Sequence, residues 1–448
     1  MQMHKPAKWI VGTLLAGAAL PAFAEQTTQS EMEALKARIA QLEAKEQQSW
    51  LNERRAEEVK TLIREVLADA DTRATLLQEG VMAGISDKGK IFLQSADGSF
   101  KMNIGGQIQF RWILDWQQDS DLTGDDDYEA GFQVRRTKLA FDGHIASPKL
   151  TYEIVLAGDR EEGGVEVEDV KIGYEFDNGL SLDIGKFKIP FLREELLSSK
   201  RQLAVDRSSV TEFFTLDRSE QIQVSYKSDM FKVAASLNDG ADEEFSTIGD
   251  DPVDFAVAVR GDLKLAGDWK QADDITSWPG EEMALFVGGA AFYQDGQEGA
   301  SDGSSDADSN YFGWTIDGQF ETNGLSLMAA LNGGHILESD DDRDMYGFLI
   351  QGGFHVSEEL EPFARFEWLD ADEAGSDELY ILTVGVNYYF KKHNAKWTTD
   401  VVMILDGDNP GSNPFGNNEF SDGLGFTGFS SADDDIYVAL RSQFQLLF

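Results

Sequence analysis

The chain contains no cysteine among its 448 residues. A disulfide framework, a thiolate metal site and a cysteine nucleophile are therefore excluded. Only five histidines are present, so a histidine-rich metal site or a histidine-based triad has few candidates. Basic residues are scarce as well, because 38 Lys and Arg stand against 81 Asp and Glu, a formal net charge of −43. Nucleic-acid phosphates select for Lys and Arg, and we expect no nucleic-acid partner.

Long hydrophobic runs are missing once the N-terminal stretch has been passed. The mean hydropathy is −0.34, and no later run reaches the length of about 18 apolar residues that a transmembrane helix needs. This does not exclude a membrane protein, because a β-barrel crosses the bilayer with alternating strands that a hydropathy average misses. The 43 Gly, 9 Pro and 29 Phe residues indicate an all-β protein rich in turns and aromatic side chains.

The N-terminus is predicted to be a secretory signal peptide covering residues 1–24. Lys5 and Lys8 form a basic start, and an apolar run of the length of a secretory core follows them. A small-residue cleavage motif ends at Ala24, and the composition changes abruptly at Glu25. The alternative is a buried N-terminal helix. A signal peptide places the mature chain in the periplasm, in the outer membrane or outside the cell.

Residues 25–80 are polar and favour a helix. Four apolar residues with the 3-4-3 spacing of a short coiled-coil seam are Met32, Leu35, Ile39 and Leu42. Two interpretations stay open: an amphipathic helix packed on a neighbour, or a periplasmic stalk that associates between protomers. Residues 81–101 are predicted to be a connecting segment.

From residue 102 to residue 448 the hydrophobic pattern alternates with a period of two. Near the start of this region most even positions are apolar, and the odd positions from Asn103 to Arg111 hold small or polar residues. The same alternation recurs along the rest of the chain. The predicted strands are residues 102–115, 130–145, 149–157, 167–177, 179–187, 220–227, 230–238, 253–264, 282–294, 311–321, 323–333, 344–355, 360–369, 378–390, 395–405 and 435–448.

The connections between these strands alternate in length. Those after odd-numbered strands are long and mostly acidic, whereas most of those after even-numbered strands are tight turns such as Asp177-Asn178-Gly179. The stretch 265–281 is the exception, a long connection among tight turns. Outer-membrane barrels have short periplasmic turns and long outer loops. The sequence therefore predicts that residues 102–448 form a 16-stranded antiparallel transmembrane β-barrel in the outer membrane of a Gram-negative-type envelope.

The two ends of the barrel domain carry further information. An even strand count puts both ends on the periplasmic side, where the helical segment 25–80 belongs. The last predicted strand alternates to its end, and Phe448 is the terminal residue. A closing strand with a terminal aromatic resembles the recognition signal of the outer-membrane barrel-assembly machinery, which we expect as a partner during biogenesis.

Acidic runs fall in the predicted outer loops. They are Asp125–Asp127, Asp340–Asp342 and Asp433–Asp435. Oxygen-rich clusters suit calcium and magnesium, so the runs have two interpretations: bridging to lipopolysaccharide through divalent cations, or simple solvation. None has the spacing of a dedicated metal loop, and we predict neither a metal site nor a cofactor. Membrane lipid and lipopolysaccharide are the expected surroundings.

The connection 188–219 differs from the other long connections because it is not acidic. Five carboxylates oppose six basic residues, which gives it a net charge of +1. We expect this third outer loop to fold into the barrel, where basic side chains in a narrow passage raise the local anion concentration. The alternative is a helical loop with surface ion pairs. The basic residues are Lys188, Arg193, Lys200, Arg201, Arg207 and Arg218.

Three motifs make a resemblance specific. The segment from Gly185 to Phe191, read as GKFKIPF, resembles the core signature of the phosphate-selective porin O/P family. The segments 131–139 and 105–109 are similar to two further strand motifs of that family. The resemblance covers roughly residues 85–448, and it implies a sixteen-stranded barrel, usually a homotrimer, whose basic lumen conducts anions.

The predicted lumen wall has mixed charge. In the second strand Leu139 and Phe141 share the lipid-facing parity, so Arg136 and Lys138 point inward. Other inward basic positions stand beside inward carboxylates, so we predict a diffusion porin with a modest preference for anions such as phosphate. A general or cation-leaning porin is the alternative. The predicted anion path comprises Arg136, Lys138, Lys188, Arg193, Lys200, Arg201 and Arg207.

An enzyme is not predicted. Barrel hydrolases need a Ser and a His together, and the histidines on predicted strands, His144, His335 and His355, are accompanied by no G-x-S-x-G motif. A structural barrel that anchors the envelope through the segment 25–80 remains the competing interpretation. Single-channel conductance separates this alternative from a porin.

Overall fold

The computed structural model describes most of the region from residue 80 to the C-terminus. The predicted signal peptide with its Ala24/Glu25 cleavage site lies outside the described residues, as do residues 25–79 apart from Lys36 and Arg38, and most of the acidic runs. The chain divides into two units, Met1–Gln78 and Glu79–Phe448. The described residues are 36, 38, 80–86, 89–117, 127–158, 163–241, 253–296, 310–337, 343–372, 378–407, 415 and 437–448.

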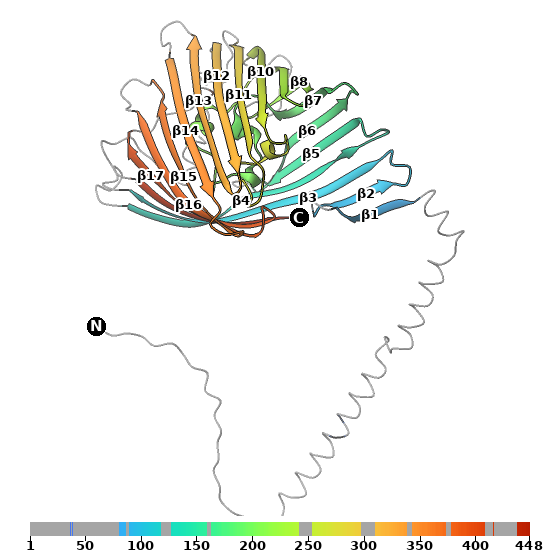
Figure 1. Cartoon of the computed structure of the whole chain (residues 1–448), viewed down its shortest axis with the longest axis horizontal. Coiled ribbons are helices and arrows are strands. Elements are labelled where there is room, and N and C mark those ends of the chain that lie inside the picture. The colour runs from blue at the N-terminus through green and yellow to red at the C-terminus, as the bar shows by residue number, and fades with distance from the viewer. Residues whose placement is uncertain are drawn as a thin grey trace, which may run out of the picture. The chain divides into compact units, whose positions relative to one another are not determined.

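The second unit is built from antiparallel strands, most of which are hydrogen-bonded to the strands before and after them in the sequence (Figure 1). Strand β18 pairs with β3 and closes the ring of β3 to β18, so the predicted 16-stranded barrel is confirmed. Each predicted strand overlaps one of these sixteen. The strands are β1 (Val81–Ile85), β2 (Ile91–Ser95), β3 (Lys101–Gln117), β4 (Asp127–His144), β5 (Leu150–Gly158), β6 (Val165–Glu175), β7 (Leu180–Lys188), β8 (Arg218–Lys227), β9 (Phe231–Asn238), β10 (Val253–Ala266), β11 (Ala284–Gly296), β12 (Asn310–Thr322), β13 (Leu325–Leu337), β14 (Arg343–Phe354), β15 (Leu360–Asp370), β16 (Leu379–Lys391), β17 (Ala395–Asp406) and β18 (Tyr437–Leu447).

The segment 81–101 contains a hairpin that the sequence analysis did not predict. Strands β1 and β2 pair with each other, and β2 also pairs with residues 101–104 of β3. The same edge of β3 pairs with β18 only from Gln107 onward. Since unpaired backbone groups on a strand edge are unfavourable and prone to wrong pairing, the hairpin completes the edge that the end of β18 leaves open.

Side chains alternate across the barrel wall. In β8, Ile222, Val224 and Tyr226 are exposed on the outer face, whereas Gln221 is buried and Gln223 lines the interior. An apolar outer band with a polar interior is the arrangement that lipid and water impose on a membrane barrel. Among the described residues, no helix has the length and apolar character needed to cross a membrane.

Two segments depart from the barrel wall and pack inside. The end of the barrel at which β4–β5, β6–β7, β8–β9, β12–β13, β14–β15 and β16–β17 are joined by short connections is termed the tight-turn end. The long inner segment (residues 189–217) joins β7 and β8 at the opposite end. The short inner segment (residues 267–283) joins β10 and β11 at the tight-turn end.

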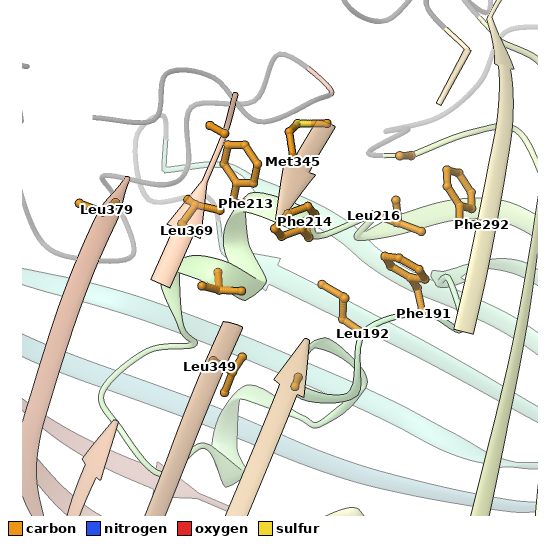
Figure 2. Packing of buried hydrophobic residues seen from close by; sticks show 14 of the residues in the cluster. Phe191, Leu192, Phe213, Phe214, Leu216, Phe292, Met345, Leu349, Leu369 and Leu379 are labelled. Carbon is orange, nitrogen blue, oxygen red and sulfur yellow. The ribbon is translucent and has the colours of Figure 1, made fainter. Parts of the chain in front are cut away.

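The long inner segment carries the main apolar core of the interior (Figure 2). It contains α4 (Arg193–Leu196), the 3-10 turn η1 (Ser199–Arg201) and α5 (Ser209–Phe214). Ser208 caps α5 by accepting a hydrogen bond from the Thr211 amide at 3.0 Å. The apolar residues from this segment and from the strands around it that Figure 2 labels are Phe191, Leu192, Phe213, Phe214, Leu216, Phe292, Met345, Leu349, Leu369 and Leu379.

A glycine on β14 permits this packing. A Cβ atom at Gly347 would lie 2.7 Å from a ring carbon of Phe214 and 2.8 Å from a methyl of Val210. Real carbon atoms do not approach so closely, so a side chain at this position would push α5 away from the wall. The close contact depends on the missing side chain.

Candidate functional site

Strand β4 carries two adjacent arginines that both enter the barrel interior. Two successive residues of β3 pair with Arg136 and Val134, so Arg135 is an extra residue in a β-bulge. In a regular strand these neighbours would point to opposite faces. The bulge instead turns both guanidinium groups toward Asp206 of the long inner segment.

The sequence analysis selected Arg136 and Lys138 but not Arg135. A signal for the bulge is present in the sequence, because the apolar parity changes along the strand. Val134 is an exposed apolar residue at an even position, and Leu139 is one at an odd position. Such a change of parity inside one strand requires one extra residue between the two positions.

Asp206 is the centre of a buried cluster of positive charge. Its carboxylate accepts hydrogen bonds from Arg111 at 2.9 Å, from Arg135 at 2.8 Å and from Arg136 at 2.8 Å. Only 2% of the Asp206 side chain is exposed. Burial alone would raise the pKa of Asp206, but the three arginines outweigh it and hold this pKa well below its ordinary value. Three strand-borne cations thereby share one loop carboxylate.

A second buried carboxylate fixes the long inner segment to strands β14 and β15. Glu194 accepts hydrogen bonds from Gln351 at 2.8 Å and from Arg365 at 3.2 Å. It also accepts hydrogen bonds from the hydroxyls of Ser208 and Thr211. Burial alone would raise the pKa of Glu194, but the charge of Arg365 and these hydrogen bonds outweigh it, so the pKa lies below the ordinary value.

A cavity of about 1210 Å³ lies between the long inner segment and the tight-turn end. Fourteen Lys or Arg side chains and nine Asp or Glu side chains line it, a surplus of five positive charges. The chain as a whole carries a net charge of −43. The sign of the charge at this cavity is therefore opposite to that of the whole chain.

The predicted basic residues fall into distinct environments. Lys138 pairs with Glu168, Lys188 with Glu195 at 2.8 Å, and Arg207 with the same Glu195 at 3.4 Å. Each of these three cations lines the cavity and has a carboxylate partner.

Arg193 and Arg136 lie elsewhere. Arg193 donates hydrogen bonds to Gln319 and to the Ala272 carbonyl. Arg136 is held by Asp206, and neither arginine is part of the cavity lining. The seven predicted residues therefore do not form one group.

Lys200 and Arg201 differ from the other predicted cations of the cavity. Within the part of the chain that the structure describes, the Lys200 ammonium has no hydrogen-bond or ion-pair partner, and Arg201 donates to the Asp273 carbonyl at 2.7 Å. Burial lowers the pKa of Lys200, and the neighbouring charges of Lys90 and Arg201 lower it further. Lys90, from the turn between β1 and β2, was missed because that hairpin was not predicted.

The arrangement offers a large space lined by an excess of positive side chains. Fixed charges at a low-dielectric wall concentrate counter-ions, so the chemistry of this lining suits small anions. Among the described residues, no group of three or more His, Asp or Glu side chains is placed to hold a metal ion.

Comparison with known proteins agrees with the barrel. Residues 107–256 match the family model of the phosphate-selective porins O and P, which confirms the family resemblance over that range. A protein of Aquifex aeolicus (strain VF5), named only as uncharacterized, is 25% identical over 294 residues, or 60% of this chain and 70% of that protein.

Solved structures with the same fold are outer-membrane porins. The anion-selective porin from Comamonas acidovorans has a TM-score of 0.52 at 13% identity and covers 78% of this chain and 99% of its own. OmpF of Salmonella typhi, in complex with daunomycin, gives 0.52 at 13% identity over 78% of this chain and 98% of its own. The fold and the family match indicate an outer-membrane protein, and they point to a channel rather than an enzyme.

Proposed function

We propose that this protein is an outer-membrane porin for passive diffusion of small hydrophilic solutes, with a modest preference for anions such as phosphate. The observation that carries the proposal is the surplus of five positive charges around the cavity in a chain of net charge −43. The match of residues 107–256 to the phosphate-selective porin family supports the same solute class.

Local charge decides selectivity more than total charge does. At physiological salt the screening length is about 8 Å, so carboxylates farther than that from the path contribute little to it. Nine carboxylates nevertheless line the cavity itself. The preference for anions is therefore modest.

The predicted path residues divide into three groups. Lys200 and Arg201 line the cavity with no carboxylate partner among the described residues, and of the seven predicted residues they contribute most to the potential that an anion meets. Lys138, Lys188 and Arg207 also line the cavity but share their charge with carboxylates. Arg136 and Arg193 position the inner segments.

The envelope context completes the proposal. The tight-turn end faces the periplasm, and the segment 25–80 lies there after cleavage between Ala24 and Glu25. Three copies assemble into a homotrimer in lipid and lipopolysaccharide, as the family resemblance implies. Phe448 is read by the barrel-assembly machinery; its ring lies over Gly106, where a Cβ atom would come within 2.2 Å of it.

The test is the reversal potential of the purified protein in planar bilayers under a KCl gradient. We expect anion preference in the wild type and a weaker preference in the variant Lys200→Ala/Arg201→Ala. The matched control is Lys149→Ala, which removes a cation that pairs with Asp177 at the tight-turn end and does not line the cavity.

Three outcomes contradict parts of the proposal. Cation preference in the wild type would leave a general or cation-leaning porin. An equal change in the control would mean that the cavity cations have no special role. Absence of conductance steps would favour the envelope-anchoring barrel.

A further inference from the structure

One connection at the tight-turn end is much longer than the others. The short inner segment runs from residue 267 to residue 283, whereas every other connection at that end has at most five residues. It does not lie outside the barrel, because Ala272, Ile275 and Ser277 are buried. A turn at this end needs only a few residues, so the extra length calls for another explanation.

The short inner segment crosses the barrel interior. It starts at β10, where Trp269 donates a hydrogen bond to the Ser228 carbonyl at 2.9 Å and stacks on Phe286. Its other anchor lies beside the turn between β16 and β17. Strands β12 to β15 separate that turn from β11 in the sheet, so the segment reaches a distant part of the wall.

Trp278 forms the distant anchor. Its ring lies 4.8 Å from Tyr389, 5.1 Å from His355 and 5.4 Å from His393, measured between ring centroids. The Lys392 ammonium lies 4.7 Å from the Trp278 ring, in cation–π distance. Aromatic contacts of this kind add to the burial of a large apolar surface.

A second contact lies beside this anchor. The Asp274 carboxylate accepts a hydrogen bond from His393 at 2.8 Å. Burial raises the pKa of Asp274, and the charge and hydrogen bond of His393 outweigh it, so this pKa is below its ordinary value. The two contacts hold one stretch of the segment against the wall.

The long inner segment rests on this crossing chain. Arg193 and Arg201 donate hydrogen bonds to the carbonyls of Ala272 and Asp273. Ile275 is fully buried in a cluster with Leu197 and other apolar side chains. Two of the predicted path cations are therefore oriented by the backbone of the short inner segment.

We propose that the short inner segment is a strut that sets the position of the long inner segment, and that Trp278 is the positioning residue that pins it to the wall. Release of the strut frees Arg193 and Arg201, widens the passage and weakens the anion preference. This inference rests on the proposed function.

The first experiment compares two tryptophans of the same segment in planar bilayers. In Trp278→Ala we expect the single-channel conductance to rise about twofold and the anion-to-cation permeability ratio to fall toward one. Trp269→Ala is the matched control, since it alters the anchor beside β10 and leaves the distant one intact. Trp278→Phe keeps an aromatic ring and should restore wild-type values.

Folding is checked by heat-modifiable migration of each variant. If Trp278→Ala yields no folded barrel, Asp274→Asn serves instead and is read by conductance alone, with a smaller rise expected, because the loss of a cavity carboxylate by itself changes the selectivity. If folded Trp278→Ala protein has the conductance and selectivity of the wild type, the proposal that the short inner segment is a strut is wrong. No conductance in the wild type would overturn the proposed function itself, so the two failures are distinguishable.

The second experiment reads the position of the segment directly. Because the chain has no cysteine, Ile275→Cys provides a single thiol at a fully buried position. We expect an anionic methanethiosulfonate reagent to leave this thiol unmodified when Trp278 is present. In a chain that also carries Trp278→Ala, we expect the reagent to modify it. Equal protection in both backgrounds would show that Trp278 does not hold the strut.

Discussion

Two groups of cations inside the barrel differ in their carboxylate partners. On the wall formed by β3 and β4, Arg111, Arg135 and Arg136 share the buried carboxylate of Asp206. At the cavity, Lys200 has no carboxylate partner among the described residues. The first group holds a loop in place, and the second keeps a charge at the cavity that is unpaired among the described residues. An inward arginine is thus evidence for a selective pore only after its partners have been identified.

The largest effect is expected from Asp206→Asn. The substitution keeps the size of the side chain and removes the charge that three arginines share. Breaking a buried ion pair from one side costs about 3–5 kcal/mol, and we expect a loss of this order in the free energy of unfolding. Urea titration of the folded barrel measures it. Asp177→Asn, at an exposed pair with Lys149, is the control and should cause no measurable change.

A smaller loss of stability is expected from Arg136→Ala. Asp206 keeps two of its arginines, so the cost is that of one charged hydrogen bond, about 1.5–3 kcal/mol. The same urea titration applies. The reversal potential should stay near that of the wild type; a loss of anion preference as large as that of a Lys200 variant would erase the distinction between the two groups.

Lys200→Glu tests the second group, the cation at the cavity without a carboxylate partner among the described residues. Stability should stay unchanged, since no ion pair within the described residues is broken, whereas the permeability ratio should fall about threefold as a positive charge beside the path becomes negative. The KCl-gradient reversal potential measures the ratio. Lys149→Glu introduces the same charge change away from the cavity and should leave the ratio unaltered.

The smallest effect is expected from mild acid. The folded-state pKa of Asp206 is depressed, so its contribution to stability is present above the unfolded value of about 3.9 and is lost only as the pH falls through the lower folded value. The stability difference between the wild type and Asp206→Asn should therefore be the same at about pH 7 and pH 5. A difference that shrinks over this interval would contradict the depressed pKa.

The barrel was predictable because lipid imposes a strict period on every strand. Strand β16, expected at 378–390, runs from Leu379 to Lys391. The hairpin β1–β2 was not predictable, because five-residue strands carry too little alternation and their need arises from the distant end of β18. Local sequence has no information about such an edge.

The interior was harder to predict than the wall. The long connection at 265–281 was noticed, but its inward course depends on partners such as Tyr389, more than a hundred residues away. Asp206 lies in a segment without periodicity, and its role depends on the bulge that brings Arg135 inward. The change of apolar parity along β4 is a signal for the bulge at Arg135. No comparable signal in the sequence identifies Asp206 as the partner of these arginines.

The hairpin at the start of the barrel has a mechanical consequence. Strand β1 runs from Val81 toward a turn that lies against the barrel, and β2 runs back along the edge of β3. A tension applied at Gly80 along the axis of β1, away from the barrel, therefore pulls the strand parallel to its neighbour. The hydrogen bonds between β1 and β2 are then loaded in shear and share the force, whereas unzipping would break them one after another. A pull on the preceding chain therefore meets this hairpin first, before the load reaches the seam between β18 and β3.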